Sequence, residues 1–206
     1  MKERRKKPVA IFMVLIGIIM ILLVALYIIL YFISNNNRPS TVGDVYLYEP
    51  DYNAQIMTEE EYLLLDRRVH YSDGVGNWPI SNDSDVYTGD AVQLFLIDYI
   101  DDLVRGDAES LRSKYSAEVI KALNIPDRFT QQRVYDIMFT EKSRKEITEY
   151  GETFFRYEFK AEYKIMRNDG TFRRDLASDS IKGQYLTIEM RSDSILITQV
   201  VEYVVK

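Results

Sequence analysis

The apolar run from Val9 to Ile33 constrains this chain more than any other feature. It contains no charged residue. At the helical rise of about 1.5 Å per residue, a helix over these residues is roughly 37 Å long, which exceeds the hydrocarbon core of a bilayer, about 30 Å. The sequence therefore predicts a single transmembrane helix at residues 9–33, preceded by a basic cytoplasmic tail at residues 1–8.

The charges around this run predict its orientation. Residues 1–8 hold five basic residues and one acidic residue, whereas Arg38 is the only cation shortly after the run. Positive charge favours the cytoplasmic side of a membrane. We expect a single-pass protein of the cell membrane, with the N-terminus in the cytoplasm, the C-terminal domain outside it, and the lipid bilayer as a partner of residues 9–33.

A cleaved signal peptide is the alternative to an anchor. Its apolar region is usually about 7–15 residues long and ends in small residues. This run is longer and ends in bulky residues, with the aromatic side chains of Tyr27, Tyr31 and Phe32 near its outer end. Aromatic residues are typical of the membrane interface. The pattern indicates an anchor that stays in place.

Composition limits what the exported part can bind. The chain has a net charge of −6, and because residues 1–8 carry +4, the remainder carries −10. Such a charge argues against nucleic acid as a partner. The chain has no cysteine, so the exported domain needs a hydrophobic core without disulfides. This composition is common in Gram-positive bacteria.

Two segments precede the main domain. Residues 34–57 are predicted to be a tether, because Asn, Pro and Ser open them. Residues 58–87 are predicted to hold a short helix and a loop. Thr58 and Glu61 form a capping box that starts a helix running to about Arg68, and a turn-rich loop around Trp78 follows.

Residues 88–206 are predicted to form the folded domain, which begins with helices. Apolar residues recur at helical spacing from Asp90 to Arg105. Gly106 is expected to cap this helix, and Asp107 to start a second helical stretch at about 108–123, with a break near Ser116. A third helix is expected from Thr130, with apolar positions Val134, Ile137 and Met138.

The spacing then changes to strict alternation. Every second residue from Phe155 to Ile165 is apolar, and charged residues lie between them, which predicts a strand with one buried face. Further strands are predicted near 146–150, near 171–174 after the turn at Asn168, at 181–190 and at 195–205. The fold class is α+β: a transmembrane helix, then helices packed on a curved antiparallel sheet of four to five strands.

This order of elements resembles the nuclear transport factor two-like (cystatin-like) fold, here as a membrane-anchored domain of Gram-positive bacteria. The resemblance covers about residues 88–206 and includes the helix from Asp90 to Arg105, followed by Gly106, Asp107 and a second helix. It implies an assembly role, as in the scaffold subunits of conjugative type IV secretion systems. No catalytic residue is implied, because no motif of the fold's enzymes is present.

The residues that usually carry catalysis or bind metal are scarce. His70 is the only histidine and is expected to be a solvated surface residue, which argues against a triad or a zinc site. The acidic loop breaks the calcium-loop pattern at Tyr87; its members are Asn82, Asp83, Asp85, Gly89 and Asp90. Asp98, Asp101 and Asp102 are read as the wet face of a helix. We expect no catalytic residue, no metal ligand, no cofactor and no enzyme.

The sequence favours a non-catalytic interaction or assembly module of the cell envelope. Its expected partner is another envelope protein or a second copy of the chain, docked on the outer strand at 195–205. Two alternatives stay open. One is a module that binds a small ligand or peptide in a tyrosine-lined pocket, and the other is a scaffold subunit of a conjugative type IV secretion system.

Overall fold

The computed structural model describes residues 47–81, 90–181 and 183–203, all within one unit, Val45–Lys206. Within these ranges, none of the helices has the length and apolar composition that a bilayer crossing requires. The predicted tail at 1–8 and membrane helix at 9–33 lie outside the described residues.

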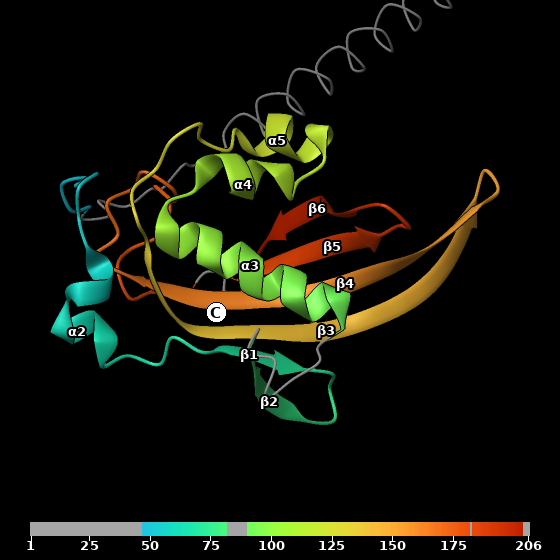
Figure 1. Cartoon of the computed structure of the whole chain (residues 1–206), viewed down its shortest axis with the longest axis horizontal. Coiled ribbons are helices and arrows are strands. Elements are labelled where there is room, and N and C mark those ends of the chain that lie inside the picture. Colours follow the sequence, from blue (N-terminus) through green and yellow to red (C-terminus); the bar gives the residue numbers. More distant parts are fainter. Residues whose placement is uncertain (1–46, 82–89, 182, 204–206) are drawn as a thin grey trace, which may run out of the picture. The chain divides into compact units, whose positions relative to one another are not determined.

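A six-stranded sheet in the order β2-β1-β3-β4-β5-β6 forms the centre of the unit (Figure 1). Its strands are β1 (Val69–Ser72), β2 (Asn77–Ile80), β3 (Arg133–Glu149), β4 (Glu152–Met166), β5 (Gln184–Met190) and β6 (Ile195–Glu202). The helices are the 3-10 turn η1 (Ile56–Thr58) and α2 (Glu60–Leu63), α3 (Ala91–Arg105), α4 (Ala108–Ser113) and α5 (Ala117–Leu123).

The prediction of a purely antiparallel sheet with four or five strands is wrong. The sheet is mixed, because β1 runs parallel to β3, pairing Val69 with Ile137 and Ser72 with Thr140. The hairpin of β1 and β2 is formed by residues predicted to be helix end and loop. Each of its strands has only four residues, too few for alternation to stand out, and partners far along the chain stabilise them.

The predicted third helix from Thr130 is also wrong, because Arg133–Glu149 is β3. The pairing of β3 with β4 shifts between Tyr135 and Met138, and Asp136 lies there with φ 50°. This bulge inserts an extra residue, so that Val134 and Ile137 are both buried although they are three positions apart. An interval of three imitates the spacing of a helix.

The predictions for the first two helical stretches after residue 88, at 90–105 and about 108–123, are confirmed. The Asp90 side chain accepts from the Val92 amide at the start of α3, and Gly106 ends that helix with φ 69°. Asp107 caps α4, and the break near Ser116 is real, because Ser116 caps α5. The predicted helix from Thr58 to Arg68 is replaced by η1 and α2, which begins after Glu59 without a side-chain cap.

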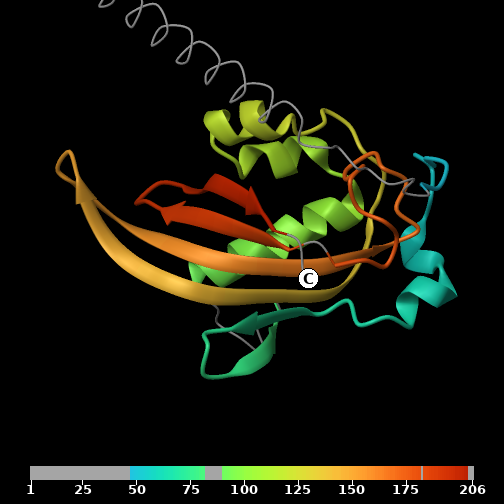
Figure 2. The same ribbon diagram turned by 180° about the vertical axis from the view of Figure 1, so that it is seen from behind.

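The alternation predicted for the central strand is confirmed in β4 from Tyr157 to Ile165, whereas Phe155 is exposed and Phe154 is buried in its place. β5 and β6 lie where expected. α3 lies along one face of the curved sheet, with α4 and α5 near the β6 edge (Figure 1, Figure 2). Between them, Leu96, Leu103, Phe139 and Phe159 are fully buried in the main hydrophobic core. The helices and the sheet thus share one core.

The predicted strand at 171–174 is not formed, because a loop follows β4. Asn168 is fully buried in this loop. Its side-chain amide donates to the carbonyl oxygens of Arg173 at 2.7 Å and Leu176 at 2.5 Å. Hydrogen bonds from one side chain thus hold this segment in place of strand pairing. The same loop borders the pocket described below.

Candidate functional site

A pocket with a volume of about 520 Å³ lies between the end of α5 and the loop after β4. Figure 2 shows that loop in orange beside the yellow segment that follows α5. The lining residues that matter below are Tyr99, Tyr115, Leu123, Asn124, Arg173 and Glu202. Pockets of roughly 300–1,000 Å³ are typical of small-ligand sites.

The local conformation of two loops shapes the walls. Asn124 ends α5 in the left-handed region with φ 49°, which turns the chain toward Asp127. On the other side, Gly170 has φ 72°, and its amide donates to the Asn168 side chain. Both turns use residue types that tolerate positive φ, so the residues at these positions suit the turns that shape the walls.

Two buried tyrosines form the floor. Tyr99 of α3 is 1 % exposed and Tyr115, between α4 and α5, is 7 % exposed. The Tyr115 hydroxyl donates to the Tyr99 hydroxyl at 3.1 Å. Burial raises the pKa of both hydroxyls, strongly for Tyr99, and the neighbouring Tyr163 adds to the effect. Both therefore remain protonated hydrogen-bond donors at neutral pH.

Arg173 is the buried charge of the pocket, with a relative exposure of 7 %. Its Nε and Nη2 donate to the two carboxylate oxygens of Asp175 at 2.9 and 3.0 Å, and Nη2 lies 3.4 Å from Glu202. Burial disfavours the charge of Arg173, but Tyr163, Glu202 and Tyr99 outweigh this effect and raise its pKa. The guanidinium is thus a permanent cation held by two acids.

Two buried polar atoms, one on this cation and one on a neighbouring tyrosine, make no hydrogen bond of normal geometry within the described part of the chain. They are Nη1 of Arg173 and the hydroxyl of Tyr163, which is itself only 2 % exposed. Buried polar groups are nearly always hydrogen-bonded, and each exception calls for an explanation. The two side chains interact with each other, since Tyr163 helps to raise the pKa of Arg173. Of the two, only Arg173 lines the pocket, and an acceptor atom of a ligand would pair with its Nη1 group.

The residues considered as candidates from the sequence lie elsewhere. His70 lies in β1 and is half-buried, with its Nε2 3.2 Å from an oxygen of Asp66, so the expectation of a solvated histidine at a helix end is wrong. Asp90, the one described member of the acidic loop, caps α3 and pairs with Arg144 at 2.5 Å. The described residues contain no cluster that could hold a metal ion.

The three aspartates of α3 differ in environment, although they were predicted to share a wet face. Asp98 is exposed and Asp101 is half-buried, and burial raises the pKa of Asp101. Asp102 is fully buried. It accepts from Arg105 at 2.7 Å, Ser110 at 2.9 Å and Lys114 at 2.5 Å. Asp102 therefore links α3 to α4 and does not line the pocket.

Both edges of the sheet are protected against a further strand. At the β6 edge, Ile197 donates its amide to the Lys114 carbonyl at 2.8 Å and accepts from the Ser116 amide at 2.9 Å. At the β2 edge, Pro79 has no backbone donor. These are usual ways to blunt a sheet edge. They weaken the expectation that a partner docks on the strand at 195–205.

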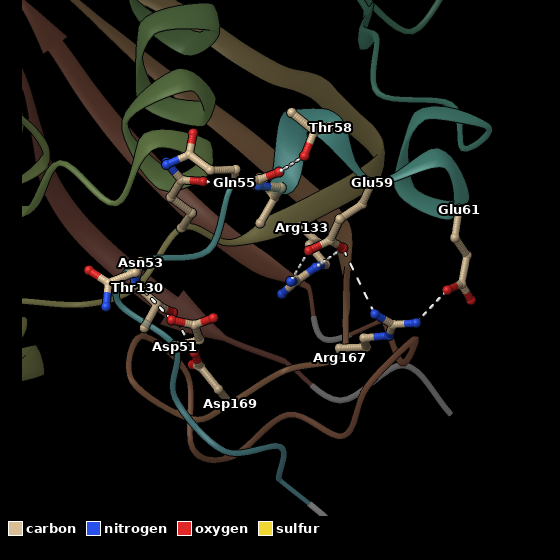
Figure 3. A network of polar contacts seen from close by, with 12 residues as sticks. Asp51, Asn53, Gln55, Thr58, Glu59, Glu61, Thr130, Arg133, Arg167 and Asp169 are labelled. Carbon is tan, nitrogen blue, oxygen red and sulfur yellow. Dashed lines mark hydrogen bonds and ion pairs between the residues drawn. The ribbon is translucent and has the colours of Figure 1, made fainter.

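A second, smaller hollow of about 90 Å³ borders the segment that enters the domain. There, the side chains of Arg133 and Arg167 hold two glutamates of this segment (Figure 3). Arg133 donates to both oxygens of Glu59 at 2.7 and 2.5 Å, and Arg167 donates to Glu61 at 2.5 Å. Ile56 beside them is fully buried. This clamp fixes residues 51–63 to the end of the sheet.

The clamp should weaken in acid. The hydrogen bond from Arg133 lowers the pKa of Glu59 below 4.5, so the stabilisation is present above that value and is lost as the pH falls through the lowered pKa. Arg133→Met should lower the free energy of unfolding by about 1–2 kcal/mol at pH 7. At pH 3 the difference from the parent chain should shrink.

Urea unfolding, followed through the single tryptophan, Trp78, measures this difference at both pH values. Arg128→Met is the control, because Arg128 lies over the ring of Tyr52 at 3.9 Å and not on a carboxylate. It should give the same small effect at pH 7 and pH 3. An Arg133→Met effect that is equally large at both pH values would show that Glu59 is not its source.

Comparison with known proteins gives no match, whether with protein-family models, curated proteins or solved structures. The pocket itself had no signal in the sequence. Arg173 lies in a stretch that was predicted to be a strand, and a buried tyrosine cannot be told from a half-exposed one by spacing alone. The prolines and glycines around the lining loops were the only local indication of turns at these positions.

Proposed function

We propose that this chain is a membrane-anchored, non-catalytic binding module that presents a small-ligand pocket outside the cytoplasm. The observation that carries the proposal is the buried Arg173 in the pocket wall, with one nitrogen that has no partner among the described residues. A buried guanidinium with an unpaired nitrogen does not stabilise a fold, because burying an unpaired polar group costs free energy. The location follows from the apolar run at 9–33 and the basic residues before it.

Catalysis is not part of the proposal. General acid–base chemistry needs a group whose pKa lies near the working pH. The pocket tyrosines have raised pKa values and Arg173 is a permanent cation. The lining groups are therefore suited to hold a molecule and not to exchange protons with it.

Native mass spectrometry of the full chain in lipid nanodiscs tests the binding function. We expect a small molecule to co-purify with the chain. Leu123→Trp should remove it, because Leu123 lies on the pocket wall and is 39 % exposed. Lys121→Trp is the matched control, since Lys121 is exposed on the same helix without lining the pocket. A chain that never carries a ligand would contradict the proposal.

Self-assembly is a second candidate, favoured by the β3–β4 hairpin, which extends past β5 and β6 (Figure 1). β1 pairs with β3 only as far as Thr140, and from Glu141 to Glu149 no other described strand pairs with that side of β3. Two antiparallel copies related by a two-fold axis at Ile147 would place Lys145 of each copy opposite Glu149 of the other, and both side chains are exposed.

Carbodiimide crosslinking in membranes tests this assembly. It joins amines directly to carboxylates, so we expect a dimer linked through Lys145 and Glu149. Lys145→Glu should remove the dimer. Lys164→Glu is the control. Lys164 lies on β4 and pairs with Asp136 of β3, away from the hairpin tip, so this variant should leave the dimer unchanged. A crosslinked product that is entirely monomeric would contradict self-assembly through β3.

A further inference from the structure

We propose that the ligand of the tyrosine-floored pocket is an uncharged sugar, held through its hydroxyl groups. The inference rests on the binding function proposed above and concerns the same pocket. It follows from three properties of the lining residues: an excess of donors at the floor, a charge that is already balanced, and a mixture of donors and acceptors around the rim.

The floor has more donors than acceptors. Tyr99 and Tyr115 share one hydrogen bond, so one of their two hydroxyl hydrogens has no acceptor in the described part of the chain. The Nη1 group of Arg173 is a further donor without a partner, and guanidinium cannot accept. An oxygen atom of the ligand would satisfy these donors, which an apolar ligand or an ammonium group could not do.

The charge of the site excludes a strongly charged ligand. Arg173 already contacts Asp175 and Glu202, and a third carboxylate on the same guanidinium would add negative charge to a buried site. Asp127 on the rim pairs with Arg112 at 2.9 Å. With Arg174 of the rim included, the three arginines balance Asp127, Asp175 and Glu202, so the site has no net charge. An uncharged oxygen therefore fits the floor better than a carboxylate.

The rim presents donors and acceptors side by side. Arg174 and the Asn124 amide can donate, whereas the carboxylates of Asp127 and Glu202 accept. A hydroxyl group donates and accepts through one atom, so a ring that carries several hydroxyls can satisfy both kinds of group. Phe172, also in the lining, offers apolar surface for the C–H face of such a ring.

A peptide fits this rim less well. Its backbone amide presents the donor and the acceptor in opposite directions, an arrangement that suits the open edge of a sheet. The pocket is lined by residues of two helices, three loops and the ends of two strands, and Ile197 of the nearby edge strand is already paired.

Saturation-transfer NMR with the full chain in lipid nanodiscs tests the ligand class without sugar-based detergent. The probes are glucose, N-acetylglucosamine, sodium acetate and glycylglycine, each alone. We expect at least one of the two sugars to bind, and neither acetate nor glycylglycine. Tyr99→Phe should weaken that binding about fivefold, the effect of one lost hydrogen bond of about 1 kcal/mol, because Tyr99 lines the pocket and Tyr115 already donates its own hydrogen to Tyr99.

Tyr163→Phe is a control for effects transmitted through Arg173. Tyr163 interacts with Arg173 but does not line the pocket, so this variant should leave sugar binding unchanged. Tyr185→Phe is a second control, because Tyr185 is an exposed tyrosine of β5 away from the pocket, and it should leave sugar binding unchanged.

The possible outcomes separate the two proposals. Binding of acetate or glycylglycine but no sugar, blocked by Leu123→Trp, overturns the ligand class and leaves the binding function standing. Sugar binding that survives both Leu123→Trp and Tyr99→Phe overturns the assignment to this pocket. If neither sugar binds, the inference is overturned. If, in addition, no ligand co-purifies with the chain, the proposed function is overturned too.

Discussion

Replacing Asp102 by alanine should lower the free energy of unfolding by about 3–4 kcal/mol, the usual result of breaking a buried ion pair from one side. The carboxylate of Asp102 is fully buried and accepts from Arg105, Ser110 and Lys114. Its removal leaves the ammonium of Lys114, whose side chain is only 13 % exposed, without a counter-charge. Urea unfolding followed by Trp78 fluorescence measures the loss.

Asp98→Ala is the matched control, because Asp98 lies on the same helix and is exposed. Its effect should stay within about 0.5 kcal/mol. Lys114→Met added to Asp102→Ala should recover part of the loss, since it removes the unpaired cation. A loss below about 1 kcal/mol for Asp102→Ala would contradict the buried network, and so would a double variant that is less stable than Asp102→Ala alone.

Gly106→Ala should cost about 3 kcal/mol, from two causes. Gly106 has φ 69°, a conformation that costs a residue with a Cβ about 1 kcal/mol or more. An added Cβ would also lie 2.9 Å from the carbonyl carbon of Thr130 and 3.0 Å from the amide nitrogen of Gln131, both backbone atoms that cannot rotate away. Overpacking of this kind adds about 1–3 kcal/mol.

Gly151→Ala separates these two causes. Gly151 has φ 82° but no atom within 4 Å of the added Cβ, so its cost should be about 1 kcal/mol, from the backbone alone. The same urea unfolding measures both variants. Equal losses at Gly106 and Gly151 would mean that the contact between the end of α3 and the segment at 129–131 is looser than the structure has it.

The elements predicted correctly from the sequence are those with a local physical cause. The caps of α3, α4 and α5 come from Asp90, Asp107 and Ser116, whose side chains bond to amides two or three residues away. β4 was predictable because its alternation is long and each buried face residue packs on the same core. These signals do not depend on distant parts of the chain.

The elements that were missed depend on long-range pairing. β1 exists because it lies beside β3, more than 60 positions later in the sequence, and four residues are too short for a pattern of their own. The start of β3 was mistaken for a helix because the bulge at Asp136 changes the spacing of buried residues from two to three. Neither the pairing of β1 with β3 nor the bulge at Asp136 can be recognised from the neighbouring residues in the sequence.

The candidate pocket was beyond prediction for a related reason. Tyr99 and Tyr115 come from the helical part of the chain, whereas Arg173 comes from a loop held by Asn168. Their proximity depends on the packing of α3 against the sheet. The sequence suggested a tyrosine-lined pocket as one alternative without naming a residue, and the wet face expected for Asp102 was wrong because α4 covers it.

Hydrogen–deuterium exchange of the full chain in lipid nanodiscs, with and without the compound that co-purifies with it, tests the binding function most directly. We expect the ligand to slow exchange in residues 123–127 and 170–175 and to leave the tip of the β3–β4 hairpin, residues 147–153, unchanged. Protection confined to the hairpin, with both pocket loops unaffected, would contradict the assignment of the functional site to the pocket.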